Sequence, residues 1–216
     1  MEVSFRPTYS VGEEIANSIT HGLGWLLSAG GLGLIVTLAA INRQAVEVVA
    51  VSVFGATLIV LYGVSTLYHA LPGQKVKRTL RVLDHSAIYF LIAGTYTPIA
   101  LVVIGGTEGW ALFGLIWGLA ALGVVVTVWG FKGAKWLEMG LYVTMGWLVV
   151  TFGRTLITMM DTAPLWLLVS GGLAYTSGLI FYGWKRLPYS HMVWHLFVLA
   201  GSVLHFLAIL FAVSLR

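Results

Sequence analysis

Apolar stretches without charged residues run through almost the whole chain, and several exceed the roughly 20 residues that a helix needs to cross a bilayer. Of the 216 residues, 59% are hydrophobic and 9% are charged, whereas about one quarter of the residues in a soluble domain are charged. No polar segment of the sequence is long enough to form a second domain. We therefore expect residues 1–216 to form one integral membrane domain, an all-α bundle of transmembrane helices.

Polar turns divide the apolar sequence into seven predicted spans. These are Asn17–Ile41, Val46–Ala70, Leu80–Gly105, Trp110–Gly130, Trp136–Thr158, Leu165–Trp184 and a last span that begins near Ser190. Pro98 lies inside the third span and should kink it. Because the first sixteen residues are polar and the first apolar run is long enough to be a span, we expect no cleavable signal peptide.

Glycine is frequent, with 26 residues, and small residues let membrane helices pack closely. The candidate positions for such close approach are Gly146 and Gly153 in the fifth span, and Gly171, Gly172 and Gly178 in the sixth. Cysteine is absent, so any metal must be held by His, Asp, Glu or water.

Lysine and arginine are unevenly divided between the two ends of the predicted spans. One side holds nine of them, and the other holds three: Arg6, Lys75, Lys77, Arg78, Arg81, Lys132, Lys135, Lys185 and Arg186 against Arg43, Arg154 and Arg216. Because basic loops stay in the cytoplasm, we expect the N-terminus inside the cell and the C-terminus outside. This topology accounts for the net charge of +4, and we expect no nucleic-acid partner.

Three histidines and one aspartate lie near span ends on the same predicted side of the membrane. His69 ends the pattern S-T-L-Y-H, Asp84 is about one turn into the third span, and His191 and His195 form H-M-V-W-H. The i, i+4 spacing of the last pair places both imidazoles on one helix face. Ionisable groups within spans are costly and usually functional, so their common depth predicts a site at the cytoplasmic end of the bundle.

The residue types at this depth are those of a zinc site. Three imidazoles can hold zinc and leave a fourth position for water, whose pKa the ion lowers to roughly 7. Asp84, the one carboxylate expected at ligand depth, could hold the water, act as general base or bind the metal directly. Ser65, one turn from His69, could bond the water or a substrate carbonyl, or orient His69. The alternative is that these are ordinary polar groups at helix ends.

Further polar residues accompany the set. Glu14, Asn17 and His21 share a helix face at the start of the first span, where they could line the mouth of the site, contact its ligands or mark a hydrated helix entry. His85 points about 100° away from its neighbour Asp84 around the helix, which favours a structural role. His205 lies about 15 Å deeper than His195, too far to share one ion.

Four stretches carry a family resemblance, and they span nearly the whole chain. They are E-E-I-A-N-S-I-T-H at Glu13 to His21, S-T-L-Y-H at Ser65 to His69, L-D-H-S-A-I-Y-F-L-I-A-G-T-Y-T-P at Leu83 to Pro98, and H-M-V-W-H at His191 to His195. The chain resembles the hemolysin III branch of the progestin and adipoQ receptor family, which is grouped with the alkaline ceramidases. The large cytoplasmic domain of the animal receptors is missing here, which puts hormone-receptor signalling in doubt.

The resemblance implies seven helices, a cytoplasmic N-terminus and zinc held by His69, His191 and His195. It also implies that Asp84 holds a zinc-bound water beside Ser65, and that the relatives hydrolyse ceramide-like lipid amides. We therefore expect a zinc-dependent lipid amide hydrolase in the plasma (inner) membrane of a bacterium, with membrane lipids as partners and a substrate that arrives laterally between helices.

Two alternatives of other classes stay open from the sequence. The first is a non-enzymatic sensor or regulator of membrane homeostasis, in which zinc only ties the second helix to the seventh. The second is a cytolytic pore, which the hemolysin name suggests but which the absence of an obvious polar stripe along the spans disfavours. A structural zinc site is closed, whereas a catalytic one keeps an open position.

Overall fold

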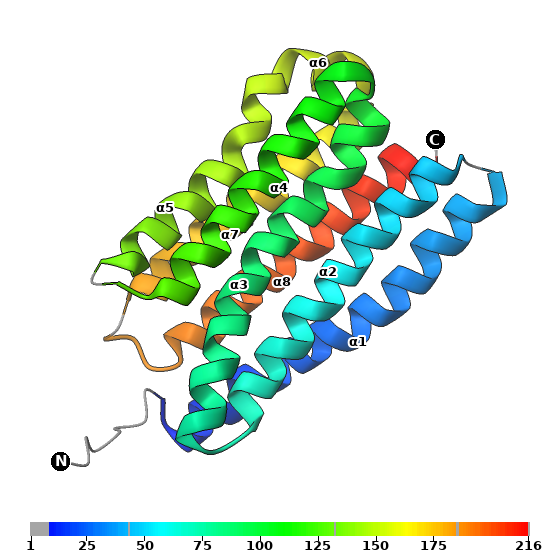
Figure 1. Ribbon diagram of the computed structural model, residues 1–216. Coiled ribbons are helices and arrows are strands. Elements are labelled where there is room, and N and C mark those ends of the chain that lie inside the picture. Colours follow the sequence, from blue (N-terminus) through cyan, green and yellow to red (C-terminus); the bar gives the residue numbers. More distant parts are fainter. Residues whose placement is uncertain (1–8, 43, 132, 185, 216) are drawn as a thin grey trace.

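The computed structural model describes residues 9–42, 44–131, 133–184 and 186–215, and every regular element within these ranges is a helix (Figure 1). Seven stretches are long and apolar enough to cross a membrane. Helices suit this setting because they satisfy their backbone hydrogen bonds internally where no water is available. The predicted all-α bundle of seven spans is confirmed, and the chain is a multi-pass integral membrane protein.

The helices follow one another through short connections. Their bounds are α1 Val11–Asn42, α2 Ala45–Ala70, α3 Gln74–Pro98, η1 Ile99–Ile104, α4 Gly106–Trp129, α5 Ala134–Trp147, η2 Leu148–Phe152, α6 Gly153–Met159, α7 Thr162–Gly183, α8 Ser190–Ile209 and η3 Leu210–Ser214. The third, fifth and seventh spans each combine an α-helix with a segment of different helical geometry.

Two helices begin earlier than the sequence predicted. α1 starts at Val11 instead of Asn17, because Ser10 caps it. The Ser10 backbone N–H donates to Glu13 Oε2 at 2.9 Å, and the Glu13 backbone N–H donates to Ser10 Oγ at 3.3 Å, which is the reciprocal capping pattern. α3 starts at Gln74 instead of Leu80, directly after Gly73, whose φ of 101° makes the turn. Hydropathy marks the lipid-facing part of a helix, so polar first turns were missed.

The helices form a ring around an enclosed interior. Consecutive helices are neighbours, and α8 returns to pack on α1, which closes the ring. The α3 span is the most enclosed of the seven. The loosest junction is the one where α5 and α6 meet α7, since these elements touch only sparsely. One side of the ring is therefore tightly packed, and the other is held by few contacts between helices.

Pro98 and Tyr96 explain two departures from regular α-helix. Pro98 ends α3, and the π-helical segment η1 follows it, so the predicted disturbance appears as a change of helical geometry. The 3₁₀ segment η2 breaks the fifth span, and Tyr96 stabilises the break. Its hydroxyl accepts the Val149 N–H at 2.7 Å and donates to the Met145 carbonyl at 2.7 Å.

The predicted glycine contacts are correct in the sixth span and wrong in the fifth. Gly171 lies directly against the His205 ring, and Gly178 lies against Trp194 and Phe197. Gly172 makes a looser contact with Trp147. Gly146 and Gly153 face open space instead of another helix. Both border a cavity, so their small size keeps a space open.

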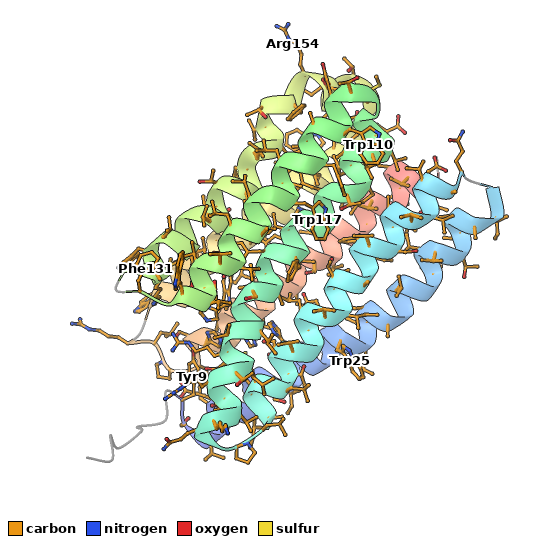
Figure 2. All side chains as sticks on the ribbon, viewed as in Figure 1. Tyr9, Trp25, Trp110, Trp117, Phe131 and Arg154 are labelled. Carbon is orange, nitrogen blue, oxygen red and sulfur yellow. The ribbon has the colours of Figure 1, made fainter. Side chains whose placement is uncertain are left out.

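The described basic residues gather at one end of the bundle, which also holds the start of α1; we call it the basic end. Lys75, Lys77, Arg78, Arg81, Lys135 and Arg186 lie at or beside the helix ends there, whereas Arg154 lies at the opposite end (Figure 2). Arg6, Arg43, Lys132, Lys185 and Arg216, which enter the charge count, lie outside the described residues. The start of α1 and the end of η3 lie at opposite ends of the bundle, as seven consecutive spans require (Figure 1).

The charge asymmetry predicts that the basic end is cytoplasmic. A reporter enzyme that is active only outside the cytoplasm should be active when fused after Arg216 and silent when inserted between Lys75 and Arg78. Measuring reporter activity in intact cells, with expression matched by immunoblotting, checks this. The reversed pattern would place the basic end outside.

Candidate metal centre

Three histidines from two helices converge at the basic end of the bundle. His69 of α2 and His191 and His195 of α8 each offer a ligand atom, and these atoms lie within 4.8 Å of one another. Zinc–nitrogen bonds of about 2.0–2.1 Å in tetrahedral geometry would place the nitrogens about 3.4 Å apart, a difference that small ring rotations can close. The predicted triad is therefore brought together as a possible metal-binding cluster.

His69 is oriented by a carboxylate. Its Nδ1 lies 2.6 Å from Glu14 Oε2, and Lys77 Nζ donates to Glu14 Oε1 at 2.7 Å. The Nδ1–H therefore donates to Glu14, which leaves Nε2 as the lone-pair nitrogen. That Nε2 is buried and has no hydrogen-bond partner among the described residues. A histidine held in this way by a carboxylate is the usual arrangement around a metal.

His195 is oriented by the backbone of α1. Its Nδ1 lies 3.2 Å from the Asn17 carbonyl oxygen and 3.2 Å from Thr20 Oγ1. A carbonyl only accepts hydrogen bonds, so Nδ1 carries the proton and Nε2 is left for a metal. The His21 ring stacks on His195 with a centroid separation of 3.5 Å, which fixes the ring plane. His21 itself is buried, and neither of its ring nitrogens has a partner within the part of the chain described.

These contacts settle what the sequence left open for Glu14, Asn17 and His21. All three lie against the ligand histidines, so the alternative of a merely hydrated helix entry is wrong. The expectation that Asp84 is the one carboxylate at ligand depth is also wrong, because Glu14 reaches His69. The sequence placed Glu14 on a helix face with Asn17 and His21, but it did not show that the packing of α1 against α2 brings this face to His69.

Asp84 and Ser65 lie beside the triad on the wall of an internal cavity. The cavity has a volume of ≈ 140 Å³, and its lining includes Ser65, Asp84, His191 and His195. Ser65 Oγ is close enough to the Asp84 carboxyl to interact with it, yet it makes no hydrogen bond of ordinary geometry to any described group. Asp84 does not belong to the converging ligand set, although it borders the same cavity as His191 and His195.

A second histidine–carboxylate pair lies on the same cavity. His85 Nδ1 is 3.1 Å from Glu138 Oε2 of α5, and the Tyr142 hydroxyl donates to the His85 carbonyl at 2.9 Å. His85 thus has the bonded partner that the sequence favoured, but it also borders the cavity. Glu138 was missed by the sequence analysis, although a lone carboxylate near the start of an apolar span is a recognisable signal.

The cavity continues into a second, apolar one. The second cavity has a volume of ≈ 330 Å³ and lies between η2, α6 and α7. The two share lining residues, including Thr95, Tyr96, Trp147 and His205. His205 therefore lies along the hollow but outside the triad, as expected. The hollow leads from the histidines to the sparsely packed junction between α5–α6 and α7.

Tyr9 covers the cluster at the basic end (Figure 2). Its ring stacks on His191 with a centroid separation of 4.9 Å. Partial burial, the largest cause, raises the pKa of the Tyr9 hydroxyl, which keeps the phenol neutral. Glu13 Oε1 accepts the Tyr189 N–H at 3.1 Å and so ties the start of α1 to the α7–α8 connection. This cover favours access between the helices over access from the end of the bundle.

Comparison with known proteins shows similarity along almost the entire chain. A family model described as Haemolysin-III related matches residues 9–206. Hemolysin-3 of Bacillus cereus is 41% identical over 208 residues, covering 96% of this chain and 95% of that protein. The Hemolysin-3 homolog of Bacillus subtilis (strain 168) is 42% identical over 203 residues, covering 94% and 95%.

A more distant similarity extends to an animal protein. The human monocyte to macrophage differentiation factor is 30% identical over 206 residues, covering 91% of this chain and 83% of that protein. No solved structure matches the chain.

The geometry predicts about one zinc ion per chain. Most of the metal should be lost in His69→Ala, which leaves two imidazoles, and in the double variant His191→Ala with His195→Ala, which leaves one. Neither number is enough for a tight site. His205→Ala should keep the metal, since it lies outside the triad. Elemental analysis of the purified proteins measures this. Full zinc in the double variant would disprove the ligand assignment.

Glu14 should set the affinity of the site. Glu14→Gln keeps an acceptor for His69 Nδ1 but removes the negative charge, and loss of such a partner weakens metal binding by about 10–100-fold. Competition with a chelator of known affinity measures the change. Glu108→Gln, in the first turn of α4 at the far end, is the matched control. Equal affinities for both variants would show that Glu14 does not support the site.

Proposed function

Because this chain belongs to the Haemolysin-III-related family of membrane proteins, we propose that it is a zinc-dependent hydrolase of lipid amides. The observation that supports this most directly is the cavity beside the triad. The cavity carries Asp84, and it opens through an apolar hollow toward the lipid. A site that served only to hold helices together would not need such a space.

The residues present fit zinc by their chemistry. Two of the three imidazoles are held through Nδ1, so that each offers a neutral Nε2, and one of these is a buried atom without a partner among the described residues. Three imidazoles leave a further coordination position, as catalytic zinc sites do. When bound, zinc supplies Lewis acidity, which polarises a carbonyl and acidifies water beside it.

Under this proposal the other residues of the site have separate roles in hydrolysis. Asp84 accepts a proton from the attacking water, since it lies beside the triad without belonging to it. Ser65 lies within reach of Asp84 and of the cavity, where its hydroxyl can hold the attacking water or the substrate carbonyl. The apolar hollow between α5–α6 and α7 holds the acyl chain. Its lateral opening suits a substrate that is dissolved in the membrane.

A second candidate function has one observation in its favour. The triad joins α2 to α8, and these helices are not among the closely packed pairs of the bundle. A metal there would add a link that packing does not supply, as a sensor or regulator with a structural zinc requires. A lytic pore has less support, because the described cavity walls are mainly apolar.

Asp84→Asn separates the two candidates. In a hydrolase this variant should keep its zinc and its fold but lose about two to four orders of magnitude in turnover, because an amide cannot accept the proton. The measurement is fatty acid release from labelled ceramide-like lipids in nanodiscs, with zinc content and thermal stability followed in parallel. Asp161→Asn, at the far end of the bundle, is the matched control.

The outcomes differ clearly between the candidates. Equal activity in the parent and Asp84→Asn would refute Asp84 as the base. A parent protein that releases no fatty acid from a broad panel of lipid amides would refute the hydrolase and favour the structural role of zinc.

A further inference from the structure

His85 and Glu138 form a polar pair that has no role so far in the proposed hydrolysis. His85 belongs to α3, and Glu138 is a buried carboxylate of α5. Their side chains meet at 3.1 Å on the wall of the cavity that also holds Asp84. Ionisable groups in a span are costly, and apolar residues of similar size often join helices as well as a buried ion pair does. The pair therefore needs a further explanation.

His85 borders the cavity, and its two ring nitrogens have different surroundings. Nδ1 faces Glu138, and Nε2 lies on the opposite side of the ring. The Tyr142 hydroxyl holds the backbone carbonyl of His85 at 2.9 Å, so both the ring and the main chain of His85 are fixed. Glu138 accepts a hydrogen bond from His85 Nδ1, as Glu14 does from His69 Nδ1, so Nε2 is the nitrogen of His85 that can exchange a proton with a bound group.

His85 and Asp84 are adjacent in sequence and project about 100° apart around α3. Both border the same cavity. They can therefore reach two different sides of one bound group, with Asp84 on the side nearer the metal ligands. This arrangement suits a reaction that removes a proton at one point and delivers a proton at another.

We propose that His85, positioned by Glu138, donates the proton to the leaving nitrogen of the lipid amide and then retains the released amine. This inference rests on the proposed function and deepens it. Under this proposal the protein recognises the amine half of the substrate as well as the acyl half.

The proton balance closes without a further reactant. Asp84 takes one proton from water as the oxygen bonds to the carbonyl carbon. The carbon–nitrogen bond breaks as the nitrogen takes the proton on His85 Nε2, which gives a carboxylic acid and an amine. Between the two proton transfers His85 is neutral and Glu138 keeps its negative charge, which favours the released amine in its ammonium form beside the pair. Return of the Asp84 proton to His85 Nε2 completes the cycle.

The proposal predicts a dependence on the leaving group. His85→Asn should reduce hydrolysis of a long-chain amide by at least about 100-fold, and Glu138→Gln should reduce it less. Hydrolysis of an activated aryl ester with the same acyl chain should stay within a few-fold of the parent, because its leaving group needs no proton. Zinc content should not change in either variant, and Glu108→Gln is the matched control for Glu138→Gln. Equal losses on amide and ester, or no loss on either, would overturn the proton-donor role.

A binding measurement tests retention of the amine independently of turnover. A fluorescent long-chain amine and the alcohol of equal chain length are titrated into the zinc-loaded protein in nanodiscs. The parent should prefer the amine by about tenfold or more, and His85→Asn and Glu138→Gln should abolish the preference. No preference in the parent, or an unchanged one in both variants, would overturn this role. If the parent hydrolyses no lipid at all, the proposed function and the proton-donor role both fail, and the amine preference alone decides whether the pair is a recognition site.

Discussion

The hydrogen bonds from α1 to the ligand histidines are the constraint on which the rest of the site depends. A neutral imidazole has one hydrogen-bond donor and one acceptor. Burying the ring with either group unpaired costs folding free energy. Glu14 accepts a hydrogen bond from Nδ1 of His69 at 2.6 Å, and the Asn17 carbonyl accepts one from Nδ1 of His195 at 3.2 Å. The described part of α1 contributes no histidine to the converging set, yet its hydrogen bonds decide which nitrogen of His69 and of His195 would face a bound metal. If α1 were displaced, both rings would be free to turn.

This constraint matches the way the ring of helices is packed. α1 packs tightly on α2 and also on α8, which are the two helices that carry the triad. The capping of α1 by Ser10 and the bond from Tyr189 to Glu13 fix its start against the α7–α8 connection. The loose junction lies across the bundle, where α5 and α6 meet α7. The side that carries the triad is densely packed, and the side where a lipid would enter under the proposed function is sparsely packed.

Much of this could be predicted from the sequence, and the failures have physical reasons. The seven spans follow from hydropathy, and the convergence of His69, His191 and His195 follows from their common depth. The role of Glu14 stayed open because its contact with His69 joins residues 55 positions apart, and only the packing of α1 on α2 brings them together. Glu138 was missed because its partner is 53 residues away, and only the packing of α5 on α3 brings them together. The cavity was not predictable, since it depends on glycines such as Gly146 that face space instead of a neighbour.

Two carboxylates at the basic end each orient a histidine from another helix, but their surroundings differ. Glu14 also binds Lys77, which balances part of its charge, and its histidine belongs to the converging triad. Glu138 makes no lysine salt bridge among the described residues, although Arg81 acts on it electrostatically. Its histidine, His85, belongs to α3 and lies outside the triad. The same local geometry therefore suits metal binding on one wall of the cavity and proton donation on the other.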